Sequence, residues 1–218
     1  MRKATQSSTS RNDAADARIF DAAWRLYAEE GFGVPLSRIA RAARVTPAQM
    51  RRSVPSKKAL MDRIFKHLFA ARWKAEWDAL LVNRALPLEA RLARFFAEYR
   101  GNIDRTNARL WTRAGLLGLH VSGNFSATLA KRILIPIIRE LRHDAGLADA
   151  PDRTVTGEEL ELAIVLHGAL AFPHTRSHIF GMDVHGSIEE LSAMTVRVWL
   201  PGAKDEVRRA NAIGRKPG

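Results

Sequence analysis

The sequence of 218 residues contains no cysteine. The chain therefore has no disulfide framework, no cysteine-ligated metal or iron–sulfur site and no cysteine nucleophile. Long apolar segments are also missing, because the longest runs, such as Ile133–Ile138, fall far short of the roughly 20 residues that a membrane-spanning helix needs. Residues 1–15 are polar and basic, and no apolar segment follows them, so we expect no secretory signal and a soluble cytoplasmic protein.

Acidic residues are the other scarce class. The chain has 35 Lys and Arg against 23 Asp and Glu, a formal charge of +12, while 46% hydrophobic residues are enough for a sizeable core. Gly31–Met61 contains seven cationic residues and no acid at all. A run of charge is often only a solvated face. An excess of this size nevertheless favours a polyanionic partner, and net charge does not choose between nucleic acid and an acidic membrane surface.

Apolar residues recur at spacings of three and four through most of the chain, which predicts helices. No convincing pair of strands and no internal repeat is present. We therefore predict an all-α protein of about nine helices. One long helix is expected from Lys57 through Leu81, Pro136 is expected to kink a later helix, and Pro201–Gly202 is expected to end the last one.

Local signals in the acid-free segment predict two short helices joined by a tight turn. Thr46 is a natural N-cap, Pro47 suits the first helical position, and Gln49 stands at the spacing of a capping box. Two such helices packed on a preceding helix form a helix-turn-helix, whose second helix lies in the major groove of DNA. Arg pairs with guanine and Gln with adenine at the base edges.

At this point the sequence resembles the TetR (tetracycline repressor) family of transcriptional regulators. The resemblance rests on the following residues: Ile19, Ala22, Ala23, Leu26, Tyr27, Gly31, Phe32, Ile39, Ala40, Ala43, Val45, Thr46–Met50, Val54, Ser56, Lys57, Ala59 and Leu60. It implies that the first three helices bind double-stranded DNA, that later helices enclose a small-molecule effector, and that the last two long helices pair in a homodimer. It implies neither an enzyme nor a cofactor.

Carried over by position, the resemblance implies a DNA-binding set of Thr46, Gln49, Arg51, Arg52, Ser53 and Lys57. The sequence departs from the family where Arg44 replaces the usual glycine of the turn and where Arg51 replaces an aromatic residue. The expected organisation is a flexible basic arm (1–15), a helix-turn-helix domain (16–58), an effector-binding and dimerisation domain (59–202) and a basic tail (203–218). The expected activity is repression from a palindromic operator.

Apolar walls with a few polar groups suit a small, largely apolar effector whose binding lowers operator affinity. The candidate effector-binding residues are Phe96, Tyr99, Trp111, His120, Phe125 and His167. For each aromatic residue, plain core packing is the alternative interpretation. Tyr99, His120 and His167 are the sharper candidates, because a buried polar tip needs a partner.

Two alternative functions stay open at the level of sequence. His174 and His178 are four residues apart, the spacing that places two metal ligands on one helix face, and His185 follows. These histidines suit a metal-sensing regulator or a metal-dependent hydrolase, although no glutamate completes a zinc-protease pattern and we assign no metal site. The second alternative is a nucleic-acid or membrane-surface binder that uses charge alone, without sequence preference.

Overall fold

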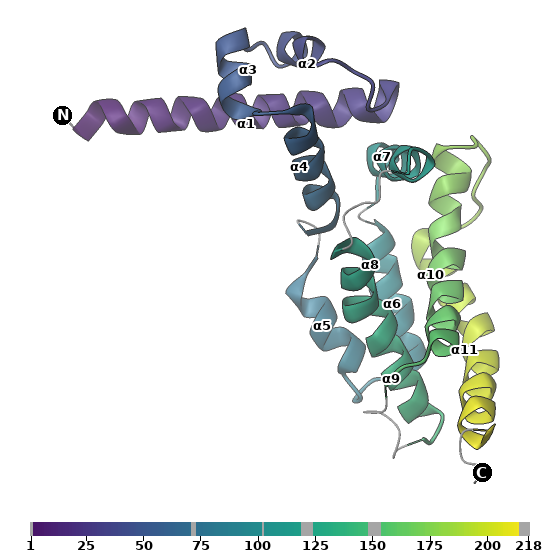
Figure 1. The fold of residues 1–218 in the computed structure, drawn as a ribbon. Helices are drawn as coiled ribbons and strands as arrows, with labels where there is room; N and C mark the ends of the chain where they lie inside the picture. The colour runs from purple at the N-terminus through teal and green to yellow at the C-terminus, as the bar shows by residue number, and fades with distance from the viewer. Residues whose placement is uncertain (1, 71–72, 102, 119–123, 148–153, 214–218) are drawn as a thin grey trace. The chain divides into compact units, whose positions relative to one another are not determined.

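The computed structural model describes residues 2–70, 73–101, 103–118, 124–147 and 154–213 (Figure 1). These residues form eleven α-helices and one π-helical turn, and no β-strand occurs among them. The predicted all-α class is confirmed, with two more α-helices than the predicted nine. Within the described ranges, no helix combines the length and the apolar character needed to cross a membrane.

The chain divides into two compact units that are each built from two stretches of sequence. One unit comprises Met1–Arg72 with Arg105–Ser122, and the other comprises Trp73–Asp104 with Gly123–Gly218. The predicted boundary after residue 58 therefore falls inside the first unit. That unit also includes the later segment that begins at Arg105, which the spacing of apolar residues did not assign to it.

The first unit contains α1 (Arg2–Glu30), α2 (Leu36–Ala42), α3 (Pro47–Ser53), α4 (Lys57–Ala70) and α7 (Arg105–Leu116). Its core takes a buried apolar residue from each of them, namely Ile19, Ile39, Met50, Ile64 and Leu110. Because α1 begins at Arg2, the segment predicted as a flexible basic arm is part of this helix. Ala15, at the end of that segment, is already buried.

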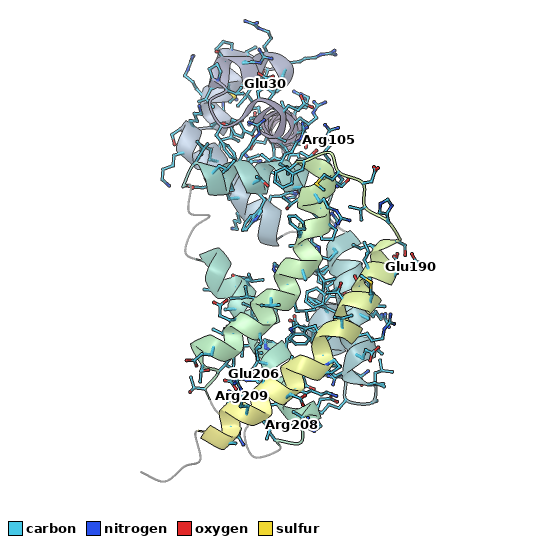
Figure 2. The ribbon with its side chains drawn as sticks, turned by 90° about the vertical axis from the view of Figure 1, so that its right-hand side faces the viewer. Glu30, Arg105, Glu190, Glu206, Arg208 and Arg209 are labelled. Atoms are coloured by element: carbon cyan, nitrogen blue, oxygen red, sulfur yellow. The ribbon has the colours of Figure 1, made fainter. Side chains whose placement is uncertain are left out.

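The second unit contains α5 (Ala75–Val82), α6 (Leu88–Gly101), α8 (Asn124–Leu129), the π-helical turn η1 (Ala130–Leu134), α9 (Ile135–Asp144), α10 (Gly157–His178) and α11 (Ile188–Ile213). Phe95, Ile138, Leu166 and Val196 lie at its core. α10 and α11 lie side by side, and α11 also packs along α6 (Figures 1 and 2). The second unit thus encloses a core of its own.

The predicted single helix from Lys57 through Leu81 is wrong. α4 ends at Ala70 and α5 begins at Ala75. The indole Nε1 of Trp73, which precedes α5, donates to Asp78 Oδ2 at 2.9 Å. Glu76 and Asp78 lie in the first turn of α5, where acids favour a helix start through the helix dipole. These local polar contacts, which apolar spacing does not reveal, favour the start of a new helix.

Two prolines act differently from the prediction. Before Pro136 the helix widens into η1, and the N–H of Ile135 donates to the carbonyl of Ala130, five residues back. A widened turn accommodates the proline ring, so a π-helical turn replaces a simple kink. α11 continues past Pro201 to Ile213, so the first part of the predicted tail is helical. The reason is packing, because Ala203 and Val207 extend its buried stripe.

Candidate functional site

The turn between α2 and α3 is a Schellman-type helix end. The N–H of Val45 donates to the carbonyl of Ala40 at 3.0 Å, and the N–H of Arg44 donates to that of Arg41 at 3.1 Å. This geometry requires a left-handed residue, and Arg44 supplies it with φ of 52°. Arg44 therefore has a conformation that glycine adopts most readily, at the cost of backbone strain.

α3 begins with the predicted capping box, which is confirmed. Thr46 Oγ1 accepts from the N–H of Gln49 at 3.2 Å, and Gln49 Oε1 accepts from the N–H of Thr46 at 2.8 Å. Pro47 occupies the first helical position. The box holds the side chain of Gln49 at the start of α3, so any base contact by Gln49 has to be shared with its capping role.

The other predicted residues of α3 differ in their surroundings. Arg51 and Arg52 are exposed and Ser53 is half-buried, while Met50 anchors the helix in the core. Arg52 Nη1 donates to Asn12 Oδ1 of α1 at 3.3 Å. The structure thus presents two guanidinium groups on the outer face of α3, and it attaches one of them to α1.

Lys57, at the start of α4, donates from Nζ to the carbonyl of Gly33 at 3.1 Å, just ahead of α2. Arg38 forms an ion pair with Glu30 at 2.6 Å. In contrast, no hydrogen bond or ion pair joins the exposed side chains of Arg41, Arg44 and Arg51 to any described residue. The helix-turn-helix therefore carries cations that described protein groups do not neutralise.

The predicted effector residues separate into two groups. Phe96 is fully buried in the second unit, where Phe95 contacts it with ring centroids 5.0 Å apart. Tyr99 stacks on Phe95 at 5.5 Å and lies 6.1 Å from the His167 ring. Phe95 of α6 therefore contacts both Phe96 and Tyr99, and Tyr99 in turn lies beside His167 of α10.

The remaining three candidates are not placed in that group. Trp111 is on α7, which belongs to the first unit, and it is 41% exposed. His120 lies outside the described residues. Phe125 is part of α8, but its side chain lies outside the described set. The candidate effector site is thus carried by α6 and α10.

Burial governs the titration of this site. It lowers the pKa of His167 from 6.5 to about 4, with a smaller contribution from the charge of Arg100. Burial also raises the pKa of Tyr99. His167 Nε2 has no hydrogen-bond partner among the described residues. At neutral pH both side chains are uncharged, and His167 offers an unused polar atom.

Several buried charges were missed at the level of sequence. Arg91 donates to Glu140 at 2.8 Å and Arg142 donates to Glu159 at 2.8 Å. Burial alone would raise the pKa of Glu140, but hydrogen bonds from Arg84 and Arg91 outweigh it and lower that pKa. Arg91 stands three residues after Leu88 and four before Phe95, so it lies on the apolar stripe of α6. A cation at such a position was the sequence signal that could have indicated a buried ion pair.

The metal hypothesis gains no support from the geometry. The rings of His174 and His178 are neighbours, with centroids 5.8 Å apart. Within the part of the chain that the structure describes, no group of three His, Asp or Glu side chains is placed to hold a metal ion. His185 is exposed in the segment between α10 and α11.

Comparison with known proteins agrees with this fold. No family model matches the sequence, and no curated protein matches it. A solved TetR-like transcriptional regulator from Rhodococcus sp. RHA1 is similar at TM-score 0.61 and 18% identity, over 86% of this chain and 96% of that one. A Mesorhizobium loti MAFF303099 protein, described as belonging to the TetR family of transcriptional regulators, is similar at TM-score 0.57 and 15% identity, over 88% and 98%. The chain has the fold of TetR-type transcriptional regulators.

Proposed function

We propose that this chain is a cytoplasmic, non-enzymatic transcriptional repressor that binds a palindromic operator as a homodimer and is released by a small organic effector. The observation that carries the proposal is the helix-turn-helix with its unneutralised cations. α3 is fixed by its capping box, and Arg41, Arg44 and Arg51 are exposed around it. Cations around a recognition helix serve phosphate and base contacts.

Support for a dimer comes from exposed apolar stripes on the two long helices at the end of the chain. On α10, Val165 is 60% and Phe172 is 53% exposed. On α11, Met194 is 46% and Val198 is 75% exposed. Large apolar side chains on adjacent helices are typical of protein–protein contacts. Two helices from each protomer would form a four-helix interface under two-fold symmetry, which presents two copies of α3 to two half-sites.

The decisive experiment is selection of bound duplexes from a random DNA pool with the full-length protein. A consensus with two inverted half-sites is expected, because a symmetric dimer places two recognition helices on the duplex. The Arg51→Ala variant, which keeps the buried face of α3, should lose enrichment of that consensus. Recovery of DNA without any shared sequence would contradict the proposal and favour the sequence-independent binder.

A further inference from the structure

Among the described residues of the second unit, three arginines are almost fully buried, and one of them differs from the other two. Arg91 is 2% and Arg142 is 0% exposed, and each forms an ion pair with a buried glutamate, Glu140 and Glu159 respectively. Arg100, on α6, is 3% exposed and forms no ion pair with a carboxylate of a described residue. Two buried guanidinium groups are thus paired with carboxylates, and the third has no counter-ion among the described residues.

The contacts of Arg100 do not compensate its charge. Its Nη2 donates to the carbonyl of Ala171 on α10 at 3.0 Å, and its buried Nε has no partner. A buried charge without an opposite charge is strongly unfavourable. Burial lowers the pKa of Arg100 from 12.5 to about 10, which still leaves it protonated at neutral pH. An anion from outside the described chain would supply what Glu140 and Glu159 supply elsewhere.

The neighbours of Arg100 are polar atoms that lack partners. His167, Ala171, His174 and His178 follow one another at spacings of four, three and four, so they share one face of α10. The Nε2 atoms of His167 and His174 are buried without a hydrogen bond among described residues. Two imidazoles with an unused ring nitrogen therefore lie on the face of α10 that Arg100 contacts through Ala171.

The residue next to Arg100 in sequence belongs to a group of aromatic rings. Tyr99 precedes Arg100 on α6, stacks on Phe95 and lies 5.7 Å from the ring of Trp77. An uncompensated guanidinium beside a wall of rings suits a molecule with one anionic end and an apolar body. Guanidinium groups pair with carboxylates through two parallel hydrogen bonds.

We propose that Arg100 binds the carboxylate of a small organic acid, with His167 and His174 as further polar contacts and Tyr99 beside the apolar body. The assignment of this acid as the effector rests on the proposed function. The same cluster does not suit a cation, because Arg100 supplies positive charge and no described acid faces it. Burial and the positive charge of Arg100 lower the pKa of His174 to about 4. A bound anion would counteract the contribution of the Arg100 charge and so raise that pKa.

The test uses thermal unfolding and calorimetry of the full-length protein with benzoate and hexanoate. Benzamide and hexanamide are uncharged controls of nearly the same shape, and phosphate and chloride are inorganic controls. At ten times its dissociation constant, at least one carboxylate should raise Tm by about 3–5 °C. The amides and the inorganic anions should leave Tm within about 1 °C. Equal shifts with a carboxylate and its amide, or no shift with either carboxylate, would overturn the proposal, and so would an equal shift with phosphate.

The variants localise the effect. Arg100→Gln removes the charge and should abolish the carboxylate shift, whereas Arg100→Lys keeps the charge and should retain a weaker one. Arg94→Gln is the matched control, because Arg94 lies on the same helix, is exposed and pairs with Glu98. A carboxylate shift in Arg100→Gln equal to that of the unchanged protein would overturn the site. If Arg100→Gln does not fold, Arg100→Lys and the carboxylate–amide comparison still decide.

Operator binding, measured by fluorescence anisotropy on the selected duplex, separates this inference from the proposed function. Release of DNA by the bound carboxylate supports both. Binding that depends on Arg100 but leaves operator affinity unchanged supports the site and overturns the role of the acid as effector. A protein that binds its operator but no carboxylate overturns the inference alone, and one that binds a carboxylate but no DNA overturns the proposed repressor.

Discussion

The guanidinium of Arg113 lies against Gly31 so closely that a Cβ built on Gly31 would stand 2.9 Å from Arg113 Nη1. Arg113 belongs to α7 and donates from Nε to the carbonyl of Ala28 at 3.1 Å and from Nη2 to that of Glu29 at 2.9 Å. These carbonyls are among the last of α1, where the helix leaves acceptors unsatisfied and a cation is favourable. α7 thus caps the helix on which the helix-turn-helix is packed.

Gly31→Ala should destabilise the protein for two reasons. Gly31 has φ of 92°, where a Cβ is strained, and the new methyl would collide with Arg113. We expect a loss of about 1–3 kcal/mol in the free energy of unfolding, measured with urea. Gly33→Ala is the matched control, since a Cβ there meets no atom within 4 Å and should change stability little. In an Arg113→Ala background the cost of Gly31→Ala should shrink, and an undiminished cost would show that backbone strain acts alone.

Arg44→Gly should stabilise the turn ahead of α3. Arg44 has φ of 52°, and glycine adopts that conformation without steric cost. Arg44→Ala loses the same charge but keeps the Cβ, so it is the control. We expect the Gly variant to exceed the Ala variant by about 1 kcal/mol in free energy of unfolding. Equal stabilities would mean that the turn carries no strain at this position.

The turn at Arg44 and the contact made by Arg113 show which features the sequence predicts and which it does not. Thr46 and Gln49 form the predicted capping box because the box is local, and three residues of sequence define it. The departure at Arg44 marked a turn position that glycine suits better. Arg113 gave no such signal, since its partners are more than 80 residues earlier in the chain. A contact of that kind depends on how helices pack, which periodicity alone does not specify.

Arg100 illustrates a signal that was present but unused. It stands four residues after Phe96 and eight after Leu92, at helical spacing from two apolar residues that are buried. A cation on such a stripe needs a counter-charge, but sequence does not say whether the protein or a ligand supplies it. Only the structure separates Arg100 from Arg142, which is paired. The same limit applies to Tyr99 and His167, whose proximity depends on the packing of α6 on α10.

The paired and unpaired arginines should respond in opposite ways to removal of charge. Arg142→Met removes the buried guanidinium that pairs with Glu159 and should cost about 3–5 kcal/mol in free energy of unfolding. Arg100→Met leaves no orphan carboxylate among described residues and should change stability by less than about 1 kcal/mol, or raise it. Urea unfolding at pH 7 in low salt measures both. If Arg100→Met were as damaging as Arg142→Met, Arg100 would have a structural partner.

Stability should fall in mild acid because of two histidines. Burial is the main cause that lowers the pKa values of His167 and His174 from 6.5 to about 4. Between these values the unfolded chain binds more protons than the folded one, so stability is present above pH 6.5 and is lost as pH falls toward 4. The urea concentration at the midpoint of unfolding should therefore be lower at pH 4.5 than at pH 7.

That drop should be smaller in the double variant His167→Asn with His174→Asn. His185→Asn is the control, because His185 is exposed in the segment before α11. The charge of Arg100 adds to the effect on both histidines, and His178 adds to that on His174. A midpoint that falls equally in the double variant would place the acid sensitivity in the carboxylates instead.

The salt dependence of operator binding tests the cations of the helix-turn-helix. If each protomer makes about 4 or 5 phosphate contacts, log K should fall against log salt with a slope near −7 to −9 for the dimer. Lys57→Ala should make that slope less steep by about 2, one contact for each protomer. Arg209→Ala, on α11 and paired with Glu206 at 2.7 Å (Figure 2), should leave it unchanged.

Arg51 and Arg52 should behave differently from Lys57. If its guanidinium reaches a base, replacing either arginine by alanine should cost about 1–3 kcal/mol in binding free energy on the selected operator. The loss on unrelated DNA should be small. Arg52→Ala also removes the bond to Asn12, so Asn12→Ala measures that contribution separately. Equal losses on operator and unrelated duplexes would reassign either arginine to the phosphates, and a salt slope near zero would contradict DNA binding by this surface altogether.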